Sequence, residues 1–203
     1  GGLDGLRRAI GMGPEAIVAE VSESGLRGRG GAGFPTGIKW KTVAGAPAAQ
    51  KYIVCNADEG DSGSFADRMI MEGDPLVLVE GMAIAGIAVG AVQGYVYCRS
   101  EYPDSIRVLE AAIGKARQAG ILGQSVLGSG HAFDMEVRVG AGASRLLPEV
   151  LGQLGLSRPF VVTDPYLAGS GRTETLLERL TSAGARATIF SDTVPDPTVA
   201  SVE

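Results

Sequence analysis

Residues 24–40 constrain this chain more than any other segment, because six of their seventeen positions are glycine. A glycine backbone can take positive φ angles and can approach a ligand without a Cβ in between. Two arginines and a lysine stand among these glycines, and Phe34 and Trp40 are close by. The combination predicts a cradle of bare backbone for a flat, anionic cofactor.

Gly28, Gly30 and Gly33 have the spacing of the dinucleotide-binding fingerprint, which follows a strand and opens a helix. Residues 13–21, which precede them, instead place apolar side chains at helical spacing after a proline. The sequence therefore excludes the ordinary Rossmann turn and favours a loop that binds a phosphate or a ring. A mobile glycine loop is the alternative, and Pro35 argues against it.

The composition indicates a folded, acidic chain. Hydrophobic residues make up 45% of the 203 positions, which is near the norm for globular proteins. The net charge of −5 argues against a nucleic-acid surface. The basic residues of the glycine segment are therefore a local feature, and a local anion is their expected partner.

Cysteine and histidine are scarce. Cys55, Cys98 and His131 are the only ones in the sequence and form no Cys-x-x-Cys or Cys/His cluster, so no zinc or iron–sulfur ligand set is visible. The longest apolar run, residues 76–92, contains Glu80 and is shorter than a confident membrane span, so it predicts a buried helix. We expect no direct membrane insertion and a cytoplasmic location.

An acidic turn follows the first strand-like run. Residues 51–56 are mostly apolar and lead directly into residues 57–63, in which Asp58, Glu59 and Asp61 are acidic. Ligands of open α/β sheets bind beyond the carboxyl ends of strands. Asn56 can donate and accept hydrogen bonds, whereas the ionised carboxylates only accept, so this turn suits ribityl or ribose hydroxyls. A solvated acidic turn is the alternative.

The remaining chain alternates between strand and helix patterns. An α/β fold follows, with a layered, mostly parallel sheet built from βαβ units. Strands are predicted at residues 51–56, 94–99, 131–139, 158–164 and 187–192, and helices at residues 76–92, 101–119, 144–154 and 173–183.

The last predicted βαβ unit ends in Asp192. An acidic residue at the end of a second strand can accept hydrogen bonds from both hydroxyls of an adenosine ribose. The loop at residues 164–171 lacks the full glycine fingerprint, so a surface aspartate is an equally good interpretation.

Two segments together resemble a known family. These are Gly-Arg-Gly-Gly-Ala-Gly-Phe-Pro-Thr-Gly-Ile-Lys-Trp at residues 28–40 and Val-Cys-Asn-Ala-Asp-Glu-Gly at residues 54–60. They resemble the FMN-binding, NADH-oxidising subunit of complex I and the flavin subunits of NAD-dependent formate dehydrogenases and NAD-reducing hydrogenases. The likeness runs over about residues 3–140, and residues 61–63 and 95–103 look closest to the formate dehydrogenase type.

The resemblance implies a glycine-rich FMN-binding loop and a set of cofactor contacts. FMN would be contacted by Gly28, Gly30, Lys39, Asn56, Asp58 and Glu59. The nicotinamide ring would stack on Gly31, Ala32 and Phe34, with Arg29 among the cofactor-binding residues. Asp61 stands where many relatives have a glutamate that contacts the NADH ribose, so its contact would be shorter.

The family pattern breaks after Gly-Ala-Gly-Ala at residues 140–143. Neither the expected Tyr-x-Cys-Gly-Glu-Glu-Thr segment nor the cysteines of a four-iron, four-sulfur cluster follow. Residues 141–203 instead resemble the N-terminal nucleotide-binding segment of iron-containing alcohol dehydrogenases, through residues 161–165 and 194–198, without that family's metal ligands. We therefore predict an FMN/NADH-binding domain at residues 1–140, incomplete at its C-terminal side, and a partial Rossmann-like βαβ segment at residues 141–203.

The function that these resemblances imply is a flavin-dependent NADH dehydrogenase (diaphorase) module. It would transfer hydride between NAD(H) and FMN, and it would pass electrons to partner subunits that carry iron–sulfur clusters. One alternative is an NAD-binding fragment related to iron-containing alcohol dehydrogenase. The other is a chimeric or truncated protein without catalysis.

Overall fold

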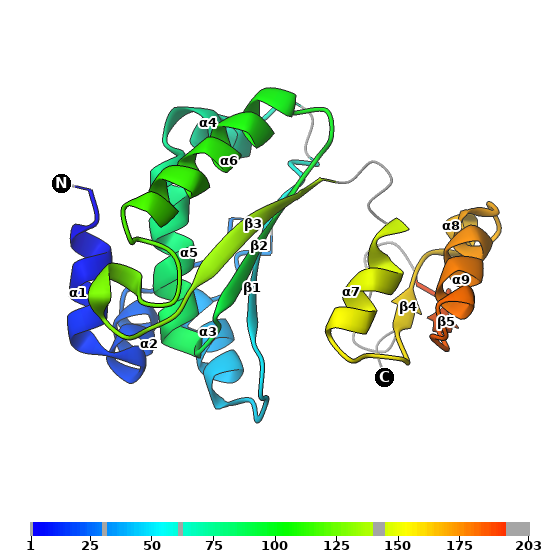
Figure 1. Ribbon diagram of the computed structural model, residues 1–203, viewed down its shortest axis with the longest axis horizontal. Coiled ribbons are helices and arrows are strands. Elements are labelled where there is room, and N and C mark those ends of the chain that lie inside the picture. Colours follow the sequence, from blue (N-terminus) through cyan, green and yellow to red (C-terminus); the bar gives the residue numbers. More distant parts are fainter. Residues whose placement is uncertain (1, 30–31, 61–62, 140–144, 194–203) are drawn as a thin grey trace. The chain divides into compact units, whose positions relative to one another are not determined.

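The computed structural model describes residues 2–29, 32–60, 63–139 and 145–193 (Figure 1). The chain forms two compact units, residues 1–140 and residues 141–203. No helix within these described ranges is both long and apolar enough to span a bilayer.

The first unit is built on a three-stranded parallel sheet in the order β1-β2-β3. These strands are β1 (Tyr52–Ala57), β2 (Gln93–Cys98) and β3 (Asp134–Val139). Helices α4 (Ala66–Gly73) and α5 (Pro75–Val89) connect β1 to β2, and α6 (Pro103–Gln118) with the short turn η1 (Val126–Gly128) connects β2 to β3. Helices α1 (Asp4–Met12), α2 (Pro14–Glu23) and α3 (Thr36–Gly45) precede the sheet. The predicted α/β fold of βαβ units is confirmed.

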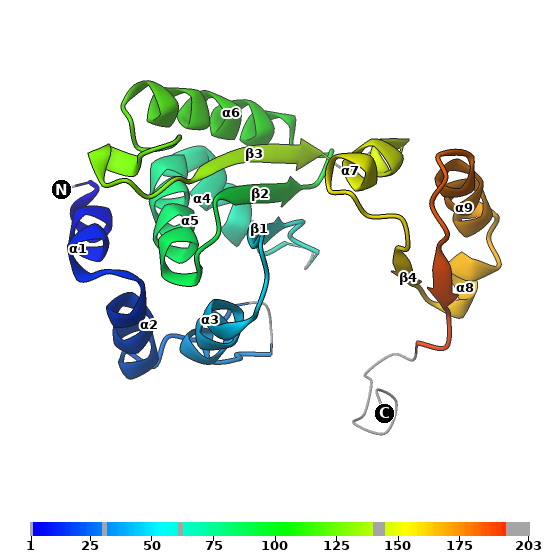
Figure 2. The same cartoon turned by 60° about the horizontal axis from the view of Figure 1, so that its bottom comes forward.

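Helix α5 is the centre of this unit. It contacts five other helices and two strands, which explains why it is apolar on all sides (Figure 2). Phe133 is fully buried against it, and Gly86 of α5 and Gly94 of β2 both face this ring. A Cβ at Gly94 would lie 2.8 Å from the Phe133 ring, so glycine sets how closely helix and sheet approach. The one charge of the helix, Glu80, accepts a hydrogen bond of 2.8 Å from the backbone N–H of Leu6 at the start of α1.

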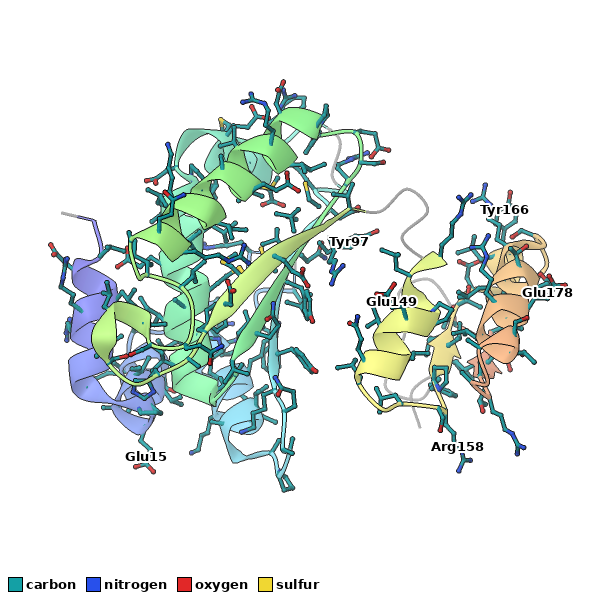
Figure 3. The ribbon with its side chains drawn as sticks, in the orientation of Figure 1. Glu15, Tyr97, Glu149, Arg158, Tyr166 and Glu178 are labelled. Atoms are coloured by element: carbon teal, nitrogen blue, oxygen red, sulfur yellow. The ribbon has the colours of Figure 1, made fainter. Side chains whose placement is uncertain are left out.

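The two faces of the sheet differ. Helices α5 and α6 pack on one face, where Val96, Cys98 and Met135 are buried. On the opposite face Val54 and Tyr97 remain 66% and 45% exposed. The Tyr97 side chain points away from α6 (Figure 3). The sheet of this unit therefore has one covered and one open face among the described residues.

The second unit contains one βαβ motif. Strands β4 (Phe160–Val162) and β5 (Thr188–Phe190) pair in parallel, with α8 (Pro165–Ala168) and α9 (Arg172–Ser182) between them and α7 (Leu147–Gln153) before them. Its buried cluster consists of Leu151, Leu180 and Ala185. The parallel βαβ arrangement predicted here is confirmed.

Most predicted elements lie within a few residues of the observed ones, but four helices of the described chain were not predicted. Helices α1, α3, α4 and α8 were missed. Helix α3 contains two glycines and two threonine residues, which are poor helix formers, and it is held by close packing of Gly37 against Ser22 of α2. A tertiary contact therefore overrides the weak local preference.

Replacing Gly86 tests the central packing. We expect Gly86→Ala to lower the free energy of unfolding by about 1–3 kcal/mol, because its Cβ would overlap the Phe133 ring. Gly81→Ala in the same helix is the matched control, because nothing lies within 4 Å of its Cβ position. The control should be neutral or stabilising, since alanine is the better helix former. Chemical denaturation measures both, and equal stabilities would contradict the packing argument.

Candidate functional site

The carboxyl ends of β1 and β2 form one edge of the sheet. Ala57 pairs with Cys98 in the parallel register, so the residues that follow each strand emerge side by side. Asp58 and Glu59 follow β1, and Arg99 follows β2. The predicted acidic turn therefore lies at the sheet edge where ligands of α/β proteins bind.

The turn after β1 has a defined conformation. The Oδ1 atom of Asn56 accepts a hydrogen bond of 3.1 Å from the backbone N–H of Asp58. Asn56 is exposed and Asp58 is half-buried. Glu59 has a φ of 48°, a left-handed conformation that is uncommon outside glycine. Such a backbone persists only where surrounding contacts hold it.

The Glu59 carboxylate is engaged within the protein. Its side chain is buried, with the residue only 8% exposed. Ser64 Oγ donates to Oε1 at 3.0 Å, and the backbone N–H of Arg68 donates to Oε2 at 2.9 Å. Because Arg68 lies in the first turn of α4, Glu59 caps this helix, whose N-cap residue Phe65 provides no side-chain hydrogen bond.

These contacts also set the pKa of Glu59. Burial works to raise the pKa of this carboxyl, but hydrogen bonds from the Arg68 backbone, Ser64, the Asp67 backbone and Tyr102 together bring the pKa below its ordinary value of 4.5. Glu59 is therefore ionised at neutral pH, and its charge faces the N-terminus of α4.

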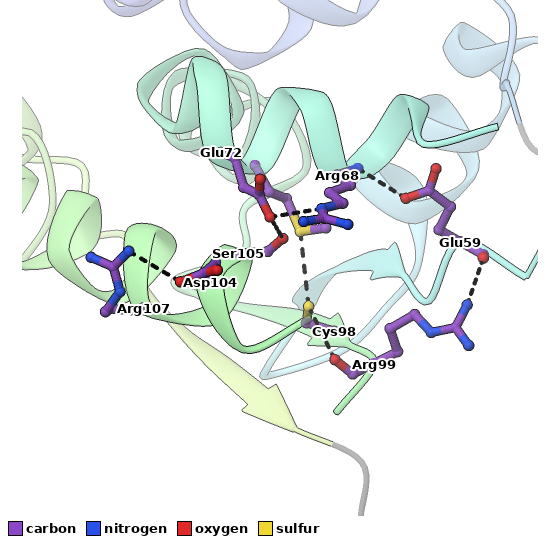
Figure 4. A network of polar contacts seen from close by, with 9 residues as sticks. Glu59, Arg68, Glu72, Cys98, Arg99, Asp104, Ser105 and Arg107 are labelled. Carbon is purple, nitrogen blue, oxygen red and sulfur yellow. Dashed lines mark hydrogen bonds and ion pairs between the residues drawn. The ribbon is translucent and has the colours of Figure 1, made fainter. Parts of the chain in front are cut away.

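Arg99 joins the two strand ends (Figure 4). Its Nη1 atom donates to the carbonyl oxygen of Glu59 at 3.0 Å, and its guanidinium lies 5.2 Å from the ring centre of Tyr102. Arg68 approaches the same ring at 5.3 Å. Sequence reasoning did not select Arg99, which is the last residue of the strand predicted at residues 94–99, although the end of a predicted strand was also the signal that identified the acidic turn.

A second polar cluster supports α4 from beneath. Glu72 accepts from Arg68 Nε at 3.0 Å and from Ser105 Oγ at 2.8 Å (Figure 4). Ser105 is fully buried at the start of α6. The acidic turn, α4 and α6 are therefore connected by hydrogen bonds from Glu59 through Arg68 to Glu72.

Within the glycine segment, residues 24–40, contacts join residues 27–28 to residues 33–35. Arg27 and Pro35 form an antiparallel bridge, and the backbone N–H of Gly28 donates to the Phe34 carbonyl at 2.9 Å. Arg27 Nη1 donates to the Gly33 carbonyl at 2.9 Å. The segment then leads directly into α3, and no described side chain caps the N-terminus of that helix. The segment thus opens a helix, although it follows α2 rather than a strand.

The other predicted site residues that the structure describes lie on the surface. Arg29, Ala32, Phe34 and Lys39 are exposed, and Lys39 lies in the first half of α3. Among the described residues, no hydrogen bond or ion pair joins the glycine segment to residues 56–59. Asp192 is exposed after β5 in the second unit. Gly30, Gly31 and Asp61 lie outside the described residues.

The two cysteines lie on the covered face of the sheet. Burial, followed by the charge of Asp67 and the neighbouring Cys98, raises the pKa of the Cys55 thiol to about 11. Burial and the Asp58 charge also raise the pKa of Cys98. In the described part of the chain, no three His, Cys, Asp or Glu side chains are grouped to hold a metal ion.

Comparison with known proteins assigns the family. The family model of the Nuo51 FMN-binding domain matches residues 21–148, a range that contains both the glycine segment and the acidic turn. The match covers more than half of the chain, and the chain therefore belongs to the Nuo51 FMN-binding domain family. The model of iron-containing alcohol dehydrogenase matches residues 135–203. Both predicted resemblances are confirmed.

Individual relatives agree with this assignment. The chain is 56% identical over 142 residues to the NADP-reducing hydrogenase subunit HndC of Solidesulfovibrio fructosivorans, covering 70% of this chain and 29% of that protein. It is 53% identical over 144 residues to a subunit of the NADH-quinone oxidoreductase of Rhizobium meliloti, covering 70% of this chain and 34% of that protein. The chain thus spans about a third of the length of these relatives.

A solved structure shares the fold. The crystal structure of NAD+-reducing [NiFe]-hydrogenase in the H2-reduced state matches with a TM-score of 0.59 and 32% sequence identity. The match covers 86% of this chain and 32% of that chain. The predicted relation to flavin subunits of oxidoreductases is confirmed at the level of the family.

Replacing the buried carboxylate should give a pH-dependent loss of stability. Because the pKa of Glu59 is lowered on folding, its ionised form contributes stability above about pH 4.5, and this is lost as the pH falls through the folded-state pKa. We expect Glu59→Gln to be less stable than the wild type at pH 7 and the difference to shrink below pH 4.5. Denaturation at several pH values measures it, with Glu110→Gln, an exposed glutamate of α6, as control. A pH-independent difference would contradict the capping role.

The thiols should react slowly in the folded protein. With a pKa of about 11, about one in a thousand Cys55 side chains is thiolate at pH 8, far less than for a thiol with the ordinary value of 9.0. We expect a disulfide reagent to modify the folded chain far more slowly than the unfolded chain, and faster as the pH is raised above 9. Reaction of Cys55 in the folded chain at the rate of a free cysteine would show that this environment is wrong.

Proposed function

We propose that the first unit binds FMN and NADH and forms part of a flavin-dependent NADH dehydrogenase, or diaphorase, module. The observation that carries this proposal is the match of residues 21–148 to an FMN-binding family, over the two segments that the sequence had selected. The relatives are named as subunits of NADP-reducing hydrogenase and NADH-quinone oxidoreductase, which supports a nicotinamide substrate.

The donors and acceptors of this unit fit FMN in chemical type. Lys39 offers an exposed ammonium near the uncapped N-terminus of α3, and such a helix end attracts an anion. Gly28 and Gly30 would let the backbone approach a ring or a phosphate. Asn56 and Asp58 offer amide and carboxylate groups at the sheet edge, which suit the ribityl hydroxyls. Glu59, whose carboxylate is already engaged, would support FMN binding by holding the turn.

The nicotinamide substrate would use the glycine segment. Gly31, Ala32 and Phe34 would form the surface for the nicotinamide ring, and Phe34 has 46% of its surface exposed for such stacking. Arg29 is exposed nearby in sequence and would attract the phosphates of NADH. Asp61 would accept from a ribose hydroxyl. When bound, FMN supplies the hydride-accepting chemistry, and the residues of this chain hold both rings in contact.

Electron transfer beyond FMN would require other carriers. The relatives are named as subunits of a hydrogenase and of a quinone oxidoreductase, so we infer partner subunits for this chain as well. The sequence resemblance implies that such partners carry iron–sulfur clusters. Specific kinship to formate dehydrogenase and a cytoplasmic location are further parts of this proposal, and they rest on the sequence resemblance alone.

The second unit supports another candidate function. Residues 135–203 match iron-containing alcohol dehydrogenase, and β4, α9 and β5 form a parallel βαβ motif that ends shortly before Asp192. Asp192 would accept from the adenosine ribose of NAD. A chain that folds but binds neither cofactor is the non-catalytic alternative.

Binding of FMN is the direct test. We expect the purified chain to take up FMN, seen as quenching of flavin fluorescence on titration, and the yellow complex to bleach when NADH is added without oxygen. Lys39→Ala should weaken FMN binding on the order of tenfold, because a charge-assisted contact is lost.

Lys41→Ala provides the matched control, because Lys41 is an exposed lysine of the same helix that lines a different surface hollow with α2. The control should bind FMN like the wild type. A folded chain that does not bind FMN would refute the proposed function, and equal affinities of the two variants would refute the role of Lys39.

A further inference from the structure

Arg99 directly follows β2, and its side chain reaches the acidic turn. Its guanidinium donates to the carbonyl oxygen of Glu59 at 3.0 Å, and residues 59 and 99 are 40 positions apart in sequence. The same guanidinium is fixed from two other sides, by Glu101 Oε2 at 3.5 Å and by the Tyr102 ring at 5.2 Å. These two contacts orient the guanidinium plane while Nη1 donates to the carbonyl.

The turn needs such a contact. Glu59 adopts a positive φ of 48°, which is unfavourable for a residue with a Cβ. The Glu59 carboxylate accepts hydrogen bonds from Ser64 and Arg68, which lie after the turn in sequence, and Asp67 and Tyr102 contribute further hydrogen bonds. The bond from Arg99 is different, because it holds the backbone carbonyl of the turn and not the Glu59 carboxylate.

We propose that Arg99 is a positioning residue for the flavin site, which acts by fixing the backbone of the acidic turn through the Glu59 carbonyl. Arg99 does not touch the cofactor in this role. It holds Asp58 at the sheet edge and, through Glu59, keeps the carboxylate aligned with the first turn of α4. The inference rests on the proposed function, since it assigns a role in binding FMN.

The charge of Arg99 suits this position. Asp58 and Glu59 are adjacent acidic residues of the turn, and Glu101 lies in the turn that follows β2. The Arg99 guanidinium interacts with the charges of Asp58 and Glu101, while its fork supplies the directed hydrogen bond to the Glu59 carbonyl. A lysine would keep the charge and could donate to the Glu59 carbonyl, but it would lose the planar contact with Tyr102.

The experiment compares four forms of the full 203-residue chain: wild type, Arg99→Ala, Arg99→Lys and Arg107→Ala. Arg107 is the matched control, because it is an exposed arginine of α6 whose ion pair with Asp104 lies apart from the turn. Two quantities are measured for each: FMN affinity by titration, and the hydrogen-exchange rate of the Arg68 backbone amide by NMR. That amide donates to the Glu59 carboxylate and reports the turn without any flavin present.

We expect Arg99→Ala to weaken FMN binding about tenfold or more and to speed exchange of the Arg68 amide by a similar factor, because a hydrogen bond from a charged donor is lost. Arg99→Lys should lie between this variant and the wild type in both measurements. If Arg99→Ala does not fold, Arg99→Lys carries the comparison. Arg107→Ala should change neither quantity by more than about twofold, as for an exposed ion pair.

Three outcomes would overturn the inference. Weaker FMN binding with an unchanged Arg68 amide would mean that Arg99 contacts the cofactor directly. A faster Arg68 amide with unchanged FMN affinity would mean that the turn does not control binding, and the proposed function would still stand. Failure of the folded wild type to bind FMN would instead refute the proposed function, and the positioning role would fall with it.

Discussion

The contact between Phe133 and two glycines determines the geometry on which the first unit depends. The ring fills the space that side chains at Gly86 and Gly94 would occupy, and it is fully buried. Because protein interiors are densely packed, α5 and β2 approach each other as closely as the Phe133 ring between their glycines allows. Because α5 also contacts α1, α2, α3, α4 and α6, this one spacing fixes where the surrounding helices lie relative to the sheet.

The positions of the residues at the sheet edge depend on that packing. Parallel pairing in register brings Ala57 beside Cys98, so two chain segments leave the sheet at the same level. Met71 of α4 lies against Cys98, with their sulfur atoms 3.9 Å apart, and packs α4 against the end of β2. Glu59 can therefore reach the first turn of α4, while Arg99 reaches the Glu59 backbone from the other strand. The polar network at the edge is a consequence of apolar contacts beneath it.

The sequence predicted the parts of this structure that depend on periodicity. Long amphipathic or apolar runs gave α5, α6 and α9, and alternation gave β3, because such patterns reflect burial directly. Helix α3 was missed because its stability comes from Gly37 packing against Ser22, a contact between segments that no local pattern records. The acidic turn was placed correctly after β1, but the burial of Glu59 was not foreseen, since a glutamate is expected to be exposed unless it has partners.

Under the proposed function, the partners of Glu59 explain how an acidic turn could lie beside an anionic cofactor. Two adjacent carboxylates would repel a phosphate or a reduced flavin if both charges faced the ligand. In this protein the Glu59 charge is directed to the Arg68 amide and the Ser64 hydroxyl, and Arg99 adds a positive charge on the opposite side of the turn. Asn56 remains exposed and Asp58 half-buried, and the side chains of both suit hydroxyls. The cationic groups, Arg29 and Lys39, belong to the glycine segment, so the chain separates acceptors for hydroxyls from donors for anions. Under the proposed function, that separation matches a cofactor that carries a polyhydroxyl chain and a phosphate on one molecule.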